Sequence, residues 1–297
     1  MRSVSTLAYL WVFLAAACAD SSDTTPSESS ILEFGPCTEF IGAYAADEGL
    51  VRTLVPEGYD LALDDYGLAQ LQVRATHCQA ITITRENGDK DEGGEHIVFQ
   101  LGAGVAPPVT LEPSPQLVDA GEHTEFHAYA TLTVTDFEPL ADALTRAGFS
   151  GVHHADDLLF ETGDDHPDSC ELVPVRGALT TPADLAMGFS GSVRDLGLEP
   201  ADGCVFGEND ETGPERALWW NEGESGTTLS DTIVPNSQRL LFNADEDFVP
   251  LPVTFTPEGE TLQAIVGSSP VPFTFTLSGI LEFGEVSTTL KPYPGLR

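Results

Sequence analysis

Alternation between apolar and polar residues with a period of two is the feature that most restricts how this 297-residue chain folds. Val, Ile, Phe and Thr dominate the alternating stretches, which are residues 71–76, 81–84, 97–101, 126–135 and 271–277, with a shorter one at 253–255. A period of two places alternate side chains on opposite faces of a strand, whereas a helix needs a period near 3.6. The pattern therefore predicts half-buried antiparallel strands.

Helical signals are fewer and shorter. Residues 136–149 have an acidic start and a glycine near the end, and residues 181–187 begin like a capping box with proline at the first helical position. Residues 48–55 and 261–266 could each form about two turns. The sequence therefore predicts a mainly β fold, an antiparallel barrel or sandwich that is closed or partly open, with a few short helices. Residues 31–297 are predicted to form one β-rich domain. The alternative is a division of this domain into two halves, with a soft boundary near 201–215.

The N-terminus is typical of an export signal. Met1 and Arg2 precede an apolar run over residues 7–17 that ends in small residues before Cys18. This arrangement resembles the bacterial lipobox, although Ala15 occupies the position where leucine is usual. Residues 1–17 are therefore predicted to be a signal peptide and Cys18 a lipidation site, which places the protein in the bacterial cell envelope as an outer-membrane lipoprotein. The alternative is ordinary cleavage after Ala17 or Ala19, which would make the protein secreted.

The residues after Cys18 predict a tether. Residues 19–30 read ADSSDTTPSESS and contain neither a basic residue nor an apolar residue larger than alanine. Such a composition favours a flexible, solvated segment, so residues 18–30 are predicted to join the anchor to the folded body.

The remaining four cysteines agree with an oxidising compartment. Pairing of nearest neighbours gives Cys37–Cys78 and Cys170–Cys204, although four cysteines allow three arrangements. A zinc site is the competing interpretation, and the absence of a C-x-x-C pair in the sequence disfavours it.

The charge restricts the partners. With 48 Asp and Glu against 12 Lys and Arg, the formal net charge is −36, so we expect no nucleic-acid partner and no contact with an anionic membrane except through the anchor at Cys18. A hydrophobic content of 41% is too high for a fully disordered chain. These observations predict an acidic protein with a packed core.

Two polar clusters are candidate sites. His123, Glu125 and His127 share one face of a predicted strand with Tyr129, and in a barrel interior this face could provide acid–base or metal-binding groups. The alternative is that the face meets solvent. The metal candidates are His153, His154, Asp156 and Asp157, followed by the acidic stretch 164–168; they could hold calcium or zinc, or simply form a solvated acidic loop.

Candidate ligand-binding residues are Arg74, Tyr129 and Trp220. Trp219 and Trp220 are adjacent in a predicted strand and should face opposite sides, one in the core and the other beside a pocket or loop. No cofactor is expected. The alternative is that the acidic loops bind calcium.

Several segments resemble the acetoacetate decarboxylase-like superfamily. They are Val55-Pro-Glu-Gly-Tyr59, residues 67–75 with Cys78 after them, residues 219–226 and residues 262–267, so the resemblance spans about residues 38–285. It implies a β fold of that type. The decarboxylase works through a lysine that forms a Schiff base beside a second lysine. Here the only lysines are Lys90 and Lys291, far apart in the sequence, so the resemblance does not extend to that chemistry.

Three functions follow as hypotheses. The first is a lipid-anchored envelope protein that binds a small apolar or amphiphilic molecule within the β fold, without catalysis. The second is an exported enzyme on the decarboxylase-like scaffold that acts on a keto- or hydroxy-acid without a Schiff-base lysine. The third is a structural or adhesion protein ordered by calcium.

Overall fold

The computed structural model describes residues 28–114, 117, 124–163, 173–193, 215–223, 226–234, 237–242, 253–266, 273–275 and 277–293. Within these residues the protein is mainly β, as the sequence predicts. No helix among them is both long and apolar enough to span a bilayer.

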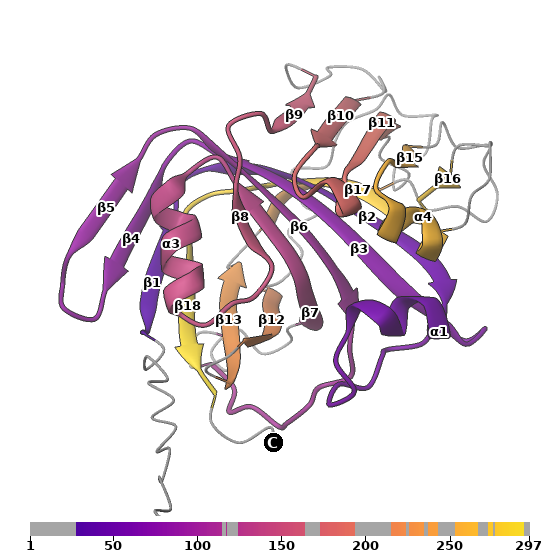
Figure 1. Ribbon diagram of the computed structural model, residues 1–297. Coiled ribbons are helices and arrows are strands. Elements are labelled where there is room, and N and C mark those ends of the chain that lie inside the picture. Colours follow the sequence, from indigo (N-terminus) through magenta and orange to yellow (C-terminus); the bar gives the residue numbers. More distant parts are fainter. Residues whose placement is uncertain are drawn as a thin grey trace, which may run out of the picture.

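A large, strongly curved sheet forms the body of the molecule and arches around a hollow (Figure 1). In spatial order its strands are β14 (Ser237–Phe242), β17 (Leu277–Phe283), β2 (Cys37–Asp47), β3 (Leu68–Cys78), β6 (His96–Gly104), β7 (Thr124–Thr135), β12 (Glu215–Gly223), β13 (Gly226–Val234), β18 (Val286–Pro292), β1 (Ser30–Phe34), β4 (Ile81–Arg85) and β5 (Lys90–Gly93). A further strand, β8 (Val152–His154), pairs with β7. Neighbouring strands are antiparallel except at β7–β12 and β7–β8, which are parallel. The described strands run from β14 at one edge to β5 at the other, so the partly open alternative of the sequence prediction is the one found.

A second, smaller sheet packs on the convex side of the arch (Figure 1). Its strands are β16 (Phe273–Thr274), β15 (Thr254–Pro257), β11 (Met187–Val193), β10 (Val173–Leu179) and β9 (Leu159–Thr162). Phe40 of β2 stacks on Phe189 of β11 with ring centroids 4.3 Å apart, which joins the two sheets through aromatic packing.

The helices of the described residues are short. They are α1 (Glu48–Val51), the 3₁₀ turn η1 (Arg52–Leu54), α3 (Glu138–Arg146), the 3₁₀ turn η2 (Ala183–Leu185) and α4 (Glu260–Val266). Helix α3 lies on the concave side of the large sheet (Figure 1). Its residues Leu140 and Leu144 are one turn apart on its buried face. The helix expected over 181–187 is reduced to η2, because Pro182 has extended backbone angles and precedes the turn instead of opening it.

The two faces of the large sheet carry separate hydrophobic cores. The inner face turns toward the hollow and α3, and includes Ile81, Ala130 and Trp219. The outer face turns toward the small sheet, α1 and α4, and includes Val73 and Trp220. The adjacent tryptophans therefore point to opposite sides, as predicted, and both are fully buried.

A β-bulge in β7 moves part of the predicted apolar face to the other side. Leu101 pairs with Leu132, but Gly102 pairs with Ala130, which leaves Thr131 as an extra residue. As a result Ala130 belongs to the inner core and Leu132 to the outer core. A Cβ atom at Gly102 would lie 2.3 Å from the Tyr129 carbonyl oxygen, so only glycine fits beside the bulge.

One predicted disulfide joins β2 and β3, which are neighbours in the arch. Cys37 of β2 and Cys78 of β3 occupy paired positions and form the bond, with Cα atoms 4.1 Å apart. The predicted Cys170–Cys204 pair, the signal peptide, Cys18 and most of the proposed tether lie outside the described residues. Strand β1 begins at Ser30, the last residue assigned to the tether, and Ser30 is already buried.

Strands from both sides of the proposed boundary at 201–215 lie in the same sheet. Strand β12, which begins at Glu215, pairs with β7 from the first half, and β18 pairs with β1. The two halves of the sequence therefore build one shared arch.

Candidate functional site

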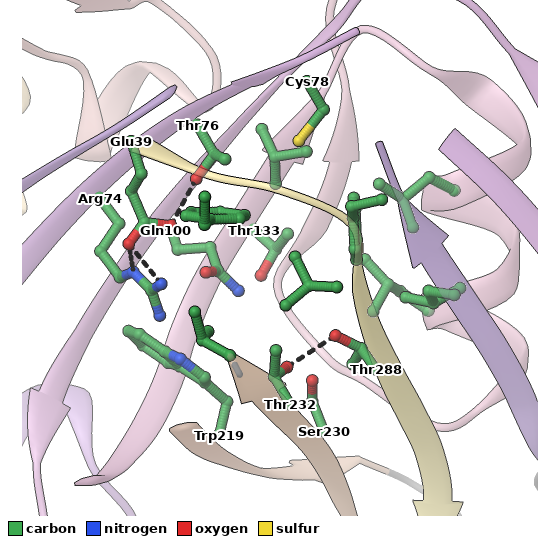
Figure 2. A pocket seen from close by; sticks show the side chains of 18 residues that line it. Glu39, Arg74, Thr76, Cys78, Gln100, Thr133, Trp219, Ser230, Thr232 and Thr288 are labelled. Atoms are coloured by element: carbon green, nitrogen blue, oxygen red, sulfur yellow. Dashed lines mark hydrogen bonds and ion pairs between the residues drawn. The ribbon is translucent and has the colours of Figure 1, made fainter. Parts of the chain in front are cut away.

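A cavity of about 90 Å³ lies on the inner face of the large sheet, under the arch and beside α3. Its wall takes residues from nine strands, which only a strongly curved sheet can bring around one space. Apolar side chains such as Leu32, Val98 and Leu144 form much of the wall. Figure 2 shows the polar side chains that face the same space from β2, β3, β6, β7, β12, β13 and β18.

An ion pair lies on one side of this cavity. Glu39 of β2 faces Thr76 of β3 in the strand register, and Arg74 is the next residue of β3 on the same face. The Nε of Arg74 donates to Oε1 of Glu39 at 3.0 Å, and its Nη2 donates to the same oxygen. Thr76 Oγ1 donates to Oε2 of Glu39 at 2.8 Å. Both carboxylate oxygens therefore accept hydrogen bonds inside the protein, as buried carboxylates require (Figure 2).

Trp219 extends the polar side of the cavity. The guanidinium carbon of Arg74 lies 5.3 Å from the centroid of the Trp219 ring, which allows a cation–π interaction. The indole Nε1 is buried, and among the described residues it has no hydrogen-bond partner. An unpaired buried donor costs roughly 1–3 kcal/mol, so a ligand oxygen that accepted from it would be favoured.

A second carboxylate lies close to the ion pair. Burial raises the pKa of Glu215, the nearby Arg74 charge lowers it and the Glu39 charge raises it. The net shift is upward, and an ionised Glu215 repels additional negative charge at this end of the inner face.

Hydroxyl groups line the opposite side. Thr232 of β13 and Thr288 of β18 share a hydrogen bond of 2.6 Å, and Ser230 lies next to them (Figure 2). Gln100 and Thr133 complete the polar lining. The cavity therefore combines apolar walls with a few fixed polar groups, a composition typical of small-molecule sites.

The outer face carries a different polar cluster, built around Arg216 of β12. Arg216 donates from Nε to Asp231 at 2.9 Å and from Nη1 to Glu125 at 3.1 Å. Lys291 Nζ also donates to Asp231, at 3.0 Å. Burial acts to raise the pKa of Asp231, but the hydrogen bonds from Arg216 and Lys291 bring it below its usual value. These contacts join β7, β12, β13 and β18 and give the cluster a structural role.

His127 extends this outer cluster toward Trp220. Trp220 Nε1 donates to His127 Nδ1 at 3.1 Å, so the neutral ring carries its proton on Nε2, which lies 3.8 Å from Glu125 Oε2. Burial lowers the pKa of His127, and Glu125 opposes that shift while Arg216 adds to it.

The His127 shift predicts a pH dependence of stability. Because the folded pKa lies below the usual value near 6.5, the unfolded chain takes up a proton first as the pH falls. The contribution of a neutral His127 to the free energy of unfolding is therefore complete above about pH 6.5, and it declines as the pH falls below that value. Thermal unfolding from pH 8 to 5 should show a steeper loss for the native protein than for His127→Gln. Parallel curves for the two proteins would contradict this assignment.

The predicted catalytic set does not gather at the cavity. Glu125, His127 and Tyr129 lie on the outer face, because the inner face of this part of β7 carries Phe126 and Ala128, so the idea that they line a barrel interior is wrong. The solvent alternative is also wrong for His127 and Tyr129, which are 8% and 4% exposed. His123 lies outside the described residues.

The predicted ligand-binding residues are divided between the faces. Arg74 lines the inner cavity, whereas Trp220 and Tyr129 are buried on the outer side. Neither Lys90 nor Lys291, the two lysines of the chain, is among the residues that line the cavity.

The metal candidates lie at β8 and the turn after it. His154 Nε2 is 3.5 Å from Asp156, and Asp157 accepts a hydrogen bond from Thr180; His153 is in β8 as well. Across the ranges that the structure describes, no group of three or more His, Cys, Asp or Glu side chains is close enough to hold a metal ion. Residues 164–168 lie outside those ranges.

Sequence reasoning missed Glu39, and it selected Trp220 where the structure places Trp219 at the cavity. A usable signal existed: each of β2 and β3 has a single charged residue in its interior, Glu39 and Arg74, and their signs are opposite. Burying either charge alone would be costly, so opposite charges in neighbouring strands indicate a pair.

No protein-family model and no curated protein matches the sequence. Among solved structures, an enduracididine biosynthesis enzyme, MppR, complexed with pyruvate shares 10% identity at a TM-score of 0.46, over 94% of this chain and 93% of that one. An acetoacetate decarboxylase from Legionella pneumophila shares 11% identity at a TM-score of 0.43, over 88% of this chain and 85% of that one. An acetoacetate decarboxylase-like enzyme from Sphingomonas wittichii RW1 shares 11% identity at a TM-score of 0.41, over 89% and 91%.

Two of these three carry the name of the superfamily that the sequence resembles. Identities of 10–11% and TM-scores below 0.5 assign neither an activity nor site residues to this chain.

Proposed function

We propose that this protein binds a small amphiphilic molecule in the inner cavity and does so without catalysis. The observation that carries the proposal is the composition of the cavity: apolar walls, the Arg74–Glu39 pair and the indole N–H of Trp219, which has no partner among the described residues. A partly open cavity with this lining favours a ligand that is mostly apolar and carries one polar group.

We propose further that the protein is exported and anchored to the cell envelope through a lipid on Cys18. The apolar run before Cys18 supports this location, and so does the Cys37–Cys78 disulfide, because such bonds persist in oxidising compartments. The acidic composition supports a solvated body held at the membrane by the anchor alone.

Native mass spectrometry of the protein, expressed with its own leader and purified in mild detergent without chelator, tests both parts. Loss of residues 1–17 together with the mass of a lipid on Cys18 would support the anchor, and a mass lower by about 4 Da than that of the reduced chain would support two disulfides. An additional organic mass that is lost on unfolding would support a bound ligand and identify its class.

Other outcomes of this measurement would contradict the proposal. A soluble chain cleaved after Ala17 or Ala19 would contradict the lipid anchor. A stoichiometric metal ion in place of an organic molecule would contradict the binding of an amphiphile and direct attention to the acidic loops.

A further inference from the structure

We infer that Glu39 makes the inner cavity select uncharged, carbonyl-bearing molecules and reject carboxylates. The inference rests on the proposed function, since it specifies which molecules the same cavity takes. It assigns Glu39 as the residue that determines specificity, through its effect on the charge of Arg74.

The charge balance of the cavity is the first argument. Among the described residues that line the cavity, Arg74 is the only one with a cationic side chain, and Glu39, 3% exposed, already neutralises it. Glu215 lies near enough to Arg74 and Glu39 for their charges to shift its pKa, and its own pKa is raised by burial. A carboxylate entering this space would lose its hydration without gaining an unpaired cation, which is unfavourable in a poorly solvated site.

The hydrogen-bonding capacity of the same groups is the second argument. The ion pair uses Nε and Nη2 of Arg74 and leaves Nη1 for a further acceptor. Trp219 supplies a second donor, because its Nε1 has no partner among the described residues. Both oxygens of Glu39 already accept hydrogen bonds. The charged side of the cavity therefore offers donors without offering net positive charge, and a neutral carbonyl oxygen complements that combination.

The size of the cavity sets the third constraint. A volume of about 90 Å³ in a partly open cavity favours a compact molecule with a short apolar part. The apolar part would contact Val98, Leu140 and Leu144 at the α3 side of the space.

A matched pair of probes tests the inference. 2-Pentanone and butanoate have the same number of heavy atoms and nearly the same shape, but only butanoate is charged at pH 7. Binding of each to the full chain would be measured by ligand-observed NMR at 0.3 M salt, where the general repulsion of anions by the acidic surface is largely screened. We expect 2-pentanone to bind the native protein at least tenfold more tightly than butanoate.

Variants assign this preference to named residues. Glu39→Gln frees the positive charge of Arg74, so butanoate affinity should rise at least tenfold while that of 2-pentanone changes little. Glu33→Gln is the matched control, because Glu33 is exposed on β1 and points away from the cavity wall formed by Leu32 and Phe34. It removes the same charge from the protein and should leave both affinities unchanged.

Trp219→Phe keeps an aromatic ring beside Arg74 but removes the indole donor. It should weaken 2-pentanone binding about fivefold and leave butanoate binding weak. Because the preference of the native protein and the effect of Trp219→Phe are measured without Glu39→Gln, the inference is testable even where that variant does not fold.

The outcomes separate the inference from the proposed function. Tighter binding of butanoate than of 2-pentanone to the native protein would overturn the selectivity and leave the cavity as a binding site. An equal gain of butanoate affinity in Glu33→Gln and Glu39→Gln would overturn the role of Glu39. Failure of both probes to bind the native protein at millimolar concentration would overturn both the inference and the proposed cavity function.

Discussion

Replacing Arg216 by glutamine is expected to lower the free energy of unfolding by about 3–5 kcal/mol, the cost of removing one partner from a buried ion pair. Arg216 is 4% exposed and holds Asp231 and Glu125 together across three strands. Without it, Lys291 is the one ion-pair partner that Asp231 keeps within the described part of the chain, and its carboxylate stays largely buried. Urea unfolding of the native protein and the variant measures the difference.

The matched control is Arg146→Gln on α3. Arg146 also forms an ion pair, with Asp142 one turn earlier at 3.5 Å, but both side chains are exposed. Exposed pairs contribute roughly 0–1 kcal/mol, so this variant should unfold at nearly the same urea concentration as the native protein. Equal losses for the two variants would show that the cluster around Arg216 has no special structural role.

Removal of the Cys37–Cys78 disulfide is expected to have a comparable effect. The bond closes a loop with a sequence separation of 41, for which the loss of unfolded-state entropy corresponds to about 4 kcal/mol. It also joins the ends of β2 and β3, the two strands that carry Glu39 and Arg74. The double variant Cys37→Ala/Cys78→Ala should therefore unfold at a clearly lower denaturant concentration.

Reductant provides an independent measurement of the same bond. In a Cys170→Ala/Cys204→Ala background, Cys37–Cys78 is the disulfide that remains. Dithiothreitol should then lower the free energy of unfolding by as much as the Cys37→Ala/Cys78→Ala substitutions do. A change below about 1 kcal/mol in both experiments would contradict the expected contribution.

The strands were predictable because apolar and polar residues alternate along them, and this alternation is expected where the two faces of a sheet differ in environment. Residues 71–76, 81–84 and 97–101 fall within β3, β4 and β6. Alternation could not reveal the bulge at Thr131, because the pattern of β7 continues through it while the faces exchange. The pairing of β7 with β12 was also beyond the sequence, since residues 136–214 separate two strands that turn out to be parallel neighbours.

The candidate site was predictable only in part. Arg74 was among the candidate ligand-binding residues, and it lines the cavity, but its partner Glu39 was not identified. The polar face with His127 was misplaced because alternation separates two faces without showing which one is concave. Both faces of this sheet are covered, so burial of polar residues on one face does not imply a ligand site there.

The pairing of β1 with β18 has a consequence for how the chain reaches its native state. Ser30 lies opposite Leu290, so nearly the whole chain must be present before β1 gains this neighbour. A chain that emerges N-terminus first can pair β1 with β4 early, but β1 keeps one unpaired edge until the last strand arrives. Contacts of such high sequence separation slow folding and prolong the exposure of strand edges. Closure of the arch between β1 and β18 is therefore a late event, which cannot occur until β18 has been synthesised.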